Sequence, residues 1–258
     1  MRFFRALNEA LQPEFGWIMG DLAGAVEGDL FGEYQRREAT RPIEKIKLIA
    51  PVNPGKIICV GRNYVEHAKE HNVDVPEVPI LFLKPTSSII GPGEHIYLPP
   101  QSKQVEHEAE LAVVIGRKGK WISIADAMNY VFGFTIANDV TARDIQSKDG
   151  QWTRGKGFDT FCPIGPWIET DLDVADTLIS CRVNQEMRQM SSTREMVFTV
   201  EQLISFASSV MTLHPGDVIL TGTPAGVGIL KEGDQVEISI EGIGSLVNSV
   251  ALDKHSSI

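Results

Sequence analysis

Three glutamates at alternate positions lead directly into an apolar segment near the middle of the chain. They are Glu106, Glu108 and Glu110, and the apolar residues 111–115 follow them. A short apolar run of this kind predicts a buried strand, and residues two apart on a strand share one face. An extended segment would therefore carry three carboxylates side by side next to the core. Like charges this close raise each other's energy unless a cation or protons neutralise them.

A fourth carboxylate, Asp139, follows a second predicted strand at residues 132–138. Burying a lone carboxylate at the end of a strand costs free energy, so Asp139 is expected to have a partner such as a metal ion. Carboxylates from two strands suit a hard divalent cation such as Mg²⁺ or Mn²⁺, and we expect no lysine or arginine among them. Zinc would recruit His or Cys, and His107 is expected to face away from the glutamates. The alternative for the glutamates is a solvated strand edge, and geometry alone leaves Glu106 a candidate ligand.

The arrangement of short segments predicts two domains and a strand-rich α+β fold. Residues 1–50 contain short apolar pieces punctuated by glycines, which predicts a small N-terminal domain of strands. A linker at residues 51–55 contains two prolines and a glycine, and residues 56–258 form the second domain. This second domain lacks the regular strand–helix alternation of a doubly wound sheet.

Two capping patterns and one polar segment give local predictions. Asn63 followed by Glu66 predicts the start of a helix over residues 64–71, and Thr199 followed by Gln202 predicts a second helix. Residues 147–157 are polar and contain glycine, so we expect a loop there.

Composition excludes several classes of protein. The 258 residues include 24 Lys and Arg and 34 Asp and Glu, a formal net charge of −10, with 43% hydrophobic residues. A chain this apolar can bury a core, and an acidic chain without a basic tract is not expected to bind nucleic acid. No apolar run reaches the roughly 18 residues of a membrane span. The N-terminal residues do not resemble a signal peptide. The three separated cysteines predict a reduced, cytoplasmic protein.

His67 and Glu70 lie three residues apart on the first predicted helix and would share a face. A carboxylate beside a histidine raises the basicity of the imidazole and orients it, as a general base requires. The alternative is a surface ion pair. Glu66 and His71 lie on the same helix, so the sequence leaves the pairing open.

Further polar residues could meet an acidic substrate. Residues 221–228 are rich in glycine, lack a phosphate-binding signature, and could present backbone N–H groups and the Thr223 hydroxyl to a carboxylate; a tight turn is the alternative. Lys84 and Lys156 are either surface lysines or cations that complement a negative substrate.

Seven short segments, in order, resemble the fumarylacetoacetate hydrolase family. They are IICVGRNY (57–64), HAKE (67–70), FLKP (82–85), HEAEL (107–111), NDVTARD (138–144), KGFD (156–159) and GTPAGVG (222–228). The resemblance covers roughly residues 56–250, and residues 1–50 resemble the small N-terminal domain of bacterial members. It implies a mixed β-sandwich roll that assembles as a homodimer. Gln185 departs from the pattern, because many relatives carry glycine there.

The resemblance also implies roles for individual residues. It implies Mg²⁺ or Mn²⁺ held by Glu108, Glu110 and Asp139, without Glu106. It implies that His67 and Glu70 activate water and that Lys156 lines the site. The substrate-binding residues that it implies are Arg62, Tyr64, Lys84, Gln146 and Thr223.

The leading hypothesis is hydrolysis of a C–C bond in an acylpyruvate, through a pyruvate enolate. The substrate would be a small pyruvyl compound or dicarboxylate. The same enolate chemistry allows an oxaloacetate decarboxylase or tautomerase, or a 2-hydroxyhepta-2,4-diene-1,7-dioate isomerase of aromatic catabolism. An alternative of another class is a non-catalytic module that binds a metal or ligand, but binding alone does not need a water-activating pair.

Overall fold

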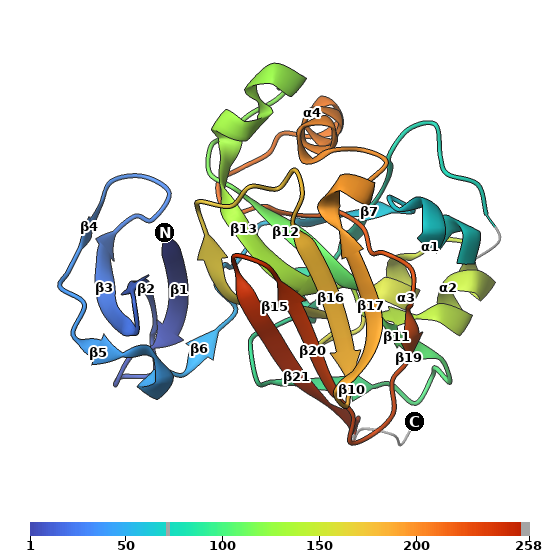
Figure 1. The fold of residues 1–258 in the computed structure, drawn as a ribbon, viewed down its shortest axis with the longest axis horizontal. Helices are drawn as coiled ribbons and strands as arrows, with labels where there is room; N and C mark the ends of the chain where they lie inside the picture. The colour runs from blue at the N-terminus through green and yellow to red at the C-terminus, as the bar shows by residue number, and fades with distance from the viewer. Residues whose placement is uncertain (71–72, 254–258) are drawn as a thin grey trace.

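One thirteen-stranded sheet connects the N-terminal strands to the main body of the molecule (Figure 1). The structure is a computed structural model that describes residues 1–70 and 73–253. Strands on the main path of this sheet are, in spatial order, β4 (Tyr34–Arg36), β3 (Leu22–Gly28), β2 (Pro13–Met19), β1 (Arg2–Leu7), β15 (Cys162–Glu169), β13 (Val131–Asn138), β12 (Ala109–Ile115), β18 (Val218–Leu220), β7 (Ile57–Gly61) and β8 (Ile80–Lys84). Three short strands pair beside this path: β5 (Arg41–Pro42), β6 (Leu48–Ile49) and β9 (Ile89–Ile90).

Two smaller sheets contain the remaining strands of the described residues. The five-stranded sheet has the order β10 (His95–Leu98), β21 (Gly244–Leu252), β20 (Gln235–Ile240), β16 (Leu178–Val183) and β17 (Glu186–Ser192). The three-stranded sheet has the order β14 (Thr141–Ala142), β11 (Val105–His107) and β19 (Gly228–Ile229). The predicted strand-rich α+β class is therefore confirmed.

The described residues contain few helices, and these are short. The α-helices are α1 (Val65–Glu70), α2 (Arg143–Asp149), α3 (Thr153–Lys156) and α4 (Val200–Val210). The 3₁₀-helices are η1 (Ile43–Lys45), η2 (Thr86–Ser88), η3 (Ile124–Tyr130) and η4 (Thr193–Glu195). Within the described ranges, no helix has the length and apolarity to cross a membrane.

The N-terminal strands form the meander that the glycine spacing predicts, and they continue the large sheet. Strand β1 pairs with β2 on one side and with β15 on the other, where Phe3 lies opposite Ile168. A small core of their own includes Phe4 and Ile18. Gly16 is required here because a Cβ atom at this position would lie 2.2 Å from the Phe4 ring. The two predicted domains therefore share one continuous sheet.

Strand β12 is buried on both faces, and its alternation decides where its glutamate points. Leu111 and Val113 belong to the main core, which includes residues of the five-stranded sheet. Ala112 and Val114 belong to a second core on the opposite face. Glu110 is two residues from Ala112, so period-two alternation directs it to the side of this second core.

Helix α4 begins as the sequence predicts. Thr199 accepts a hydrogen bond from the Gln202 backbone N–H, and the Gln202 side chain accepts one from the Thr199 backbone N–H. This reciprocal pair is a capping box, which satisfies two N–H groups that the first turn leaves unpaired.

Thr199→Ala is expected to lower the free energy of unfolding by about 0.5–2 kcal/mol, because it removes the side-chain acceptor of this cap. Urea unfolding followed by circular dichroism measures the change. Thr86→Ala, an exposed threonine outside the capping box, is the matched control. Equal destabilisation in the two variants would contradict the cap assignment.

Two local predictions are wrong. Asn63 does not cap α1, because its side chain bridges the backbone of Phe198 and Thr221 over distances of 2.8–3.0 Å. Residues 147–157 are not a loop throughout, since α2 extends to Asp149 and α3 contains Lys156. The predicted helix end at residue 71 lies outside the described residues.

Candidate active site

The pairing of β12 with β13 brings three carboxylates together. Ala109 lies opposite Asn138, so Asp139 follows directly beside Glu108, whose carbonyl accepts a hydrogen bond of 2.9 Å from the Asp139 backbone N–H. Glu108, Glu110 and Asp139 each offer one oxygen, and these oxygens lie within 4.8 Å of one another. All three side chains are buried, with at most 4% of the residue exposed. These are the three carboxylates that the family resemblance implies as metal ligands.

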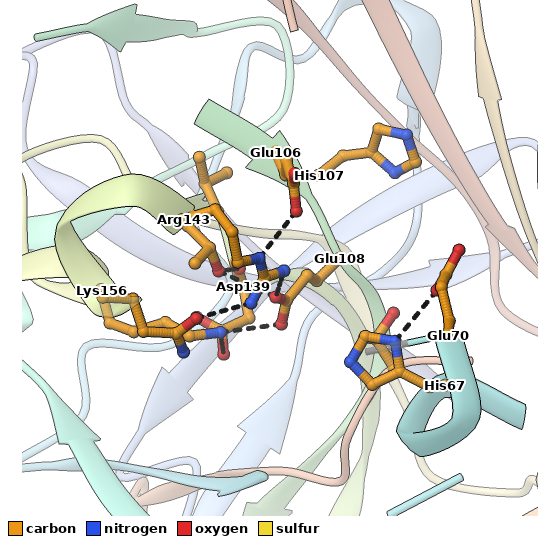
Figure 2. Close-up of polar contacts among 12 residues, drawn as sticks. His67, Glu70, Glu106, His107, Glu108, Asp139, Arg143 and Lys156 are labelled. Atoms are coloured by element: carbon orange, nitrogen blue, oxygen red, sulfur yellow. Dashed lines mark hydrogen bonds and ion pairs between the residues drawn. The ribbon is translucent and has the colours of Figure 1, made fainter. Parts of the chain in front are cut away.

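Three cationic side chains surround this group, so the expectation that no lysine or arginine lies among the carboxylates is wrong. Lys156 Nζ lies 2.7 Å from Asp139 and 2.8 Å from Glu108 (Figure 2). Lys84 Nζ lies 2.6 Å from the other Asp139 oxygen, and Arg143 pairs with Glu108. Burial raises the pKa of Glu108, but Lys156 and Arg143 outweigh it and the net pKa is lowered.

Glu110 differs from its neighbours in lacking such a cation. Its carboxylate accepts a hydrogen bond of 2.6 Å from the Gly222 backbone N–H, and within the described part of the chain no lysine or arginine forms an ion pair with it. Burial, and then the charges of Asp139 and Glu108, raise the pKa of Glu110. The three carboxylates lie beside three cations, one of which, Arg143, also pairs with Glu106. Convergent carboxylate oxygens, one group of which lacks a cationic partner among the described residues, fit a hard divalent cation.

Glu106 lies apart from this group. The chain leaves regular strand structure at Glu108, so Glu106 belongs to β11 in the three-stranded sheet rather than to β12. Its carboxylate binds Arg143 Nε at 2.7 Å and the Gln104 amide at 2.6 Å. The break in the strand explains why three glutamates at alternate positions do not converge. His107 points away from the carboxylates, as expected (Figure 2).

His67 and Glu70 face each other on α1. His67 Nδ1 lies 3.4 Å from Glu70 Oε2, and the Glu70 carboxylate also accepts from the Gly226 backbone N–H at 3.2 Å (Figure 2). His67 is buried, with 7% of the residue exposed, so the pair is not an ordinary surface ion pair. The Gly226 contact anchors Glu70, which in turn orients the imidazole.

A cavity of about 330 Å³ joins the carboxylates to the histidine. Its lining includes His67, Glu108, Glu110, Asp139, Lys156 and, from the predicted substrate-binding set, Arg62, Gln146 and Thr223. Tyr64 and Lys84 are not part of this lining. Lys84 is held by Asp139 and by the Val140 carbonyl, and the buried Tyr64 hydroxyl has no hydrogen-bond partner among the described residues. The geometry therefore favours a supporting position for these two residues, behind the cavity wall.

Sequence comparison then decides the family. A sequence profile described as fumarylacetoacetate (FAA) hydrolase C-terminal matches residues 56–251, three quarters of the chain. The chain belongs to the fumarylacetoacetate hydrolase family. A second profile, described as Rv2993c-like N-terminal, matches residues 1–51. The family assignment and the sandwich-type fold that the sequence indicated are confirmed.

Proteins similar to this chain include ones named as isomerases and tautomerases. The mitochondrial oxaloacetate tautomerase Fahd2a of Rattus norvegicus is 52% identical over 221 residues, which cover 81% of this chain and 71% of the rat protein. The solved structure of a 5-carboxymethyl-2-hydroxymuconate delta-isomerase from Mycobacterium smegmatis has 45% identity and a TM-score of 0.92, covering 98% of this chain and 100% of its own. A 2-hydroxyhepta-2,4-diene-1,7-dioate isomerase from Mycobacterium marinum has 43% identity and a TM-score of 0.91, with coverage of 98% and 99%.

Sequence reasoning missed three cavity residues of this family member. Arg143 forms ion pairs with Glu108 and Glu106 and donates a hydrogen bond of 2.7 Å to Gln146 Oε1. It lies in the NDVTARD segment (138–144), but the sequence assigned it no role. Phe82 and Trp152 form an edge-to-face pair with ring centroids 5.1 Å apart, and Lys156 Nζ lies 5.1 Å from the Phe82 centroid. No sequence pattern connects these residues, since the pairing is made by the fold.

Proposed function

We propose that this protein is a divalent-metal-dependent enzyme that interconverts keto and enol forms of a small 2-oxodicarboxylate such as oxaloacetate. The observation that carries the proposal is the buried, convergent Glu108–Glu110–Asp139 group on the wall of a cavity that also contains His67 and Lys156. The named relatives support the proton-shift reaction, because tautomerases and isomerases both move a proton next to a carbonyl or enol group.

The residues around the cavity could stabilise the negative charge that develops on the enolate oxygen in such a reaction. Glu108, Glu110 and Asp139 would hold Mg²⁺ or Mn²⁺, which when bound polarises a 2-oxo group and stabilises enolate charge. Burial lowers the pKa of Lys156, but Asp139 and Glu108 offset this and the net pKa is raised, so its ammonium stays charged. A buried ammonium beside the developing enolate oxygen stabilises the transition state.

The proton is moved by His67 in this proposal. The imidazole takes a proton from the carbon next to the 2-oxo group and returns a proton to the enolate oxygen, so the substrate gains and loses one proton. Glu70 holds the imidazole through Nδ1 and stabilises its protonated form. Arg62, Gln146 and Thr223 line the cavity and supply donors for the substrate carboxylates.

A second candidate is hydrolysis of an acylpyruvate, the leading hypothesis from the sequence. The pairing of buried His67 with Glu70 favours it, because the same base can take a proton from water. Turnover of oxaloacetate enol, acetylpyruvate, fumarylpyruvate and hydroxy-diene-dioates with saturating Mg²⁺ separates the candidates. We expect the highest kcat/KM for the oxaloacetate enol. No turnover of any 2-oxo acid would reject both candidates and favour a non-catalytic binding module.

His67→Gln is expected to lower tautomerisation by about 10²–10⁴-fold, the usual contribution of a positioned general base. Metal-promoted decarboxylation of oxaloacetate needs no base and should change far less. Both rates are measured on the same purified variant at saturating Mg²⁺. His95→Gln, an exposed histidine outside the cavity lining, is the control. Equal losses in the two reactions would show that His67 does not act as the base.

A further inference from the structure

Gln189 connects the metal-binding strand to the glycine-rich loop from behind the cavity. It lies on β17 and is 1% exposed. Its Oε1 lies 3.1 Å from the Ala109 backbone nitrogen and 2.9 Å from His107 Nδ1. Its Nε2 lies 2.7 Å from Thr223 Oγ1 and 2.8 Å from the Pro224 carbonyl oxygen.

The two backbone contacts fix the orientation of the Gln189 amide. The Ala109 N–H can only donate, so the atom facing it must be the amide oxygen. The Pro224 carbonyl can only accept, so the atom facing it must be the amide nitrogen. A flipped amide would place nitrogen against N–H and oxygen against carbonyl, and would leave buried polar groups without partners.

This orientation determines the protons of two neighbours. His107 must carry a proton on Nδ1 in order to donate to Gln189 Oε1, and in the neutral ring Nε2 is then unprotonated. The Thr223 oxygen must accept a hydrogen bond from the Gln189 amide, so the Thr223 proton remains available to the cavity that Thr223 lines. The hydroxyl is thereby set as a donor before any ligand arrives.

We propose that Gln189 is a positioning residue that fixes the Thr223 hydroxyl as a hydrogen-bond donor toward a carboxylate or enolate oxygen of the substrate. The inference rests on the proposed function, because a donor pointing into the cavity helps an anionic 2-oxo acid. A pre-oriented donor needs no reorganisation during the reaction, which favours binding of the enolate.

The first test needs no ligand. Nitrogen NMR of ¹⁵N-histidine-labelled protein reports which ring nitrogen of His107 carries the proton, with the signals assigned by their loss in His107→Asn. We expect protonated Nδ1 and unprotonated Nε2. The opposite tautomer would mean that His107 accepts a hydrogen bond from the Gln189 amide nitrogen. The amide would then be flipped, its oxygen would face Thr223, and the proposal would be overturned whatever reaction the protein catalyses.

The second test measures binding of oxalate, a planar mimic of the enolate, by calorimetry at saturating Mg²⁺. In Gln189→Glu the new carboxylate accepts the Thr223 proton and turns the donor away from the cavity. We expect the oxalate Kd to rise about 10–100-fold, the worth of a hydrogen bond to a charged group. Gln189→Met releases the hydroxyl without offering an acceptor for its proton, and should have a smaller effect in the same direction.

The Thr223→Val background separates positioning from support of the fold. There the Gln189 substitutions should change the oxalate Kd by less than about threefold, because the donor is already absent. Gln235→Glu, an exposed residue on β20, is the matched control and should leave binding unchanged. Equal losses with and without the Thr223 hydroxyl, or no loss in either Gln189 variant, would overturn the proposal. Failure of the wild-type protein to bind oxalate would count against the proposed function, and the His107 tautomer would still decide the orientation of Gln189.

Discussion

Glu110→Gln is expected to abolish metal binding and turnover while leaving the metal-free protein as stable as before, or more stable. Glu110 is a buried carboxyl group whose described partner is the Gly222 N–H rather than a cationic side chain, and its pKa is raised. Glutamine keeps the shape and removes the cost of ionising this buried group, so the free energy of unfolding should not fall. A hard cation loses one of three carboxylate ligands, and we expect the Mg²⁺ or Mn²⁺ affinity to drop by more than about 100-fold.

Glu106→Gln is the matched control for this substitution. The residue is also a buried glutamate in the same segment, but its carboxylate binds Arg143 and Gln104. We expect Glu106→Gln to keep metal binding, measured by calorimetry, and to lose some stability because it weakens the contact with Arg143. Chelator dialysis of the wild-type protein should abolish turnover, and Mg²⁺ or Mn²⁺ should restore it. Loss of metal in Glu106→Gln but not in Glu110→Gln would contradict the ligand assignment.

Lys84→Met is expected to lower the free energy of unfolding by about 3 kcal/mol or more. The Lys84 side chain is fully buried, and its Nζ contacts Asp139 at 2.6 Å and the Val140 carbonyl at 3.1 Å. Removing one partner of a buried ion pair leaves the other charge uncompensated, which is the origin of the large cost. Lys156 still contacts Asp139, which keeps the expected loss near the lower end of the range for buried pairs.

Urea unfolding in the presence of a chelator measures this loss without a contribution from bound metal. Lys69→Met is the control, because the Lys69–Glu66 pair is exposed and such pairs contribute little. Adding Asp139→Asn to Lys84→Met should recover part of the stability, since the uncompensated carboxylate is then neutral. A Lys84→Met protein as stable as Lys69→Met would show that this ion pair does not support the fold.

The sequence by itself determined the features that depend on local pattern. Short apolar runs predicted the strands that became β12 and β13, because a run of neighbouring apolar residues is a local pattern. The Thr199–Gln202 capping box was readable because both partners lie within one turn. The carboxylates Glu108 and Asp139 could be brought together in the prediction because each lies at the end of a strand. The ordered motifs of residues 56–250 indicated the family.

Only the tertiary structure decided which charges meet, and the reason is sequence separation. Asp139 contacts Lys84 and Lys156, which lie 55 and 17 residues away, and no local pattern encodes that distance. Glu106 is set apart by one residue of irregular backbone at Glu108, which an alternation argument does not detect. Gln189 lies 34 residues from Thr223, on β17 of the five-stranded sheet. It also contacts Ala109 of the thirteen-stranded sheet, so its role depends on how these two sheets pack. Long-range hydrogen bonds and ion pairs form only when folding brings the strands together, and for that reason the chemical environment of the site had to come from the structure.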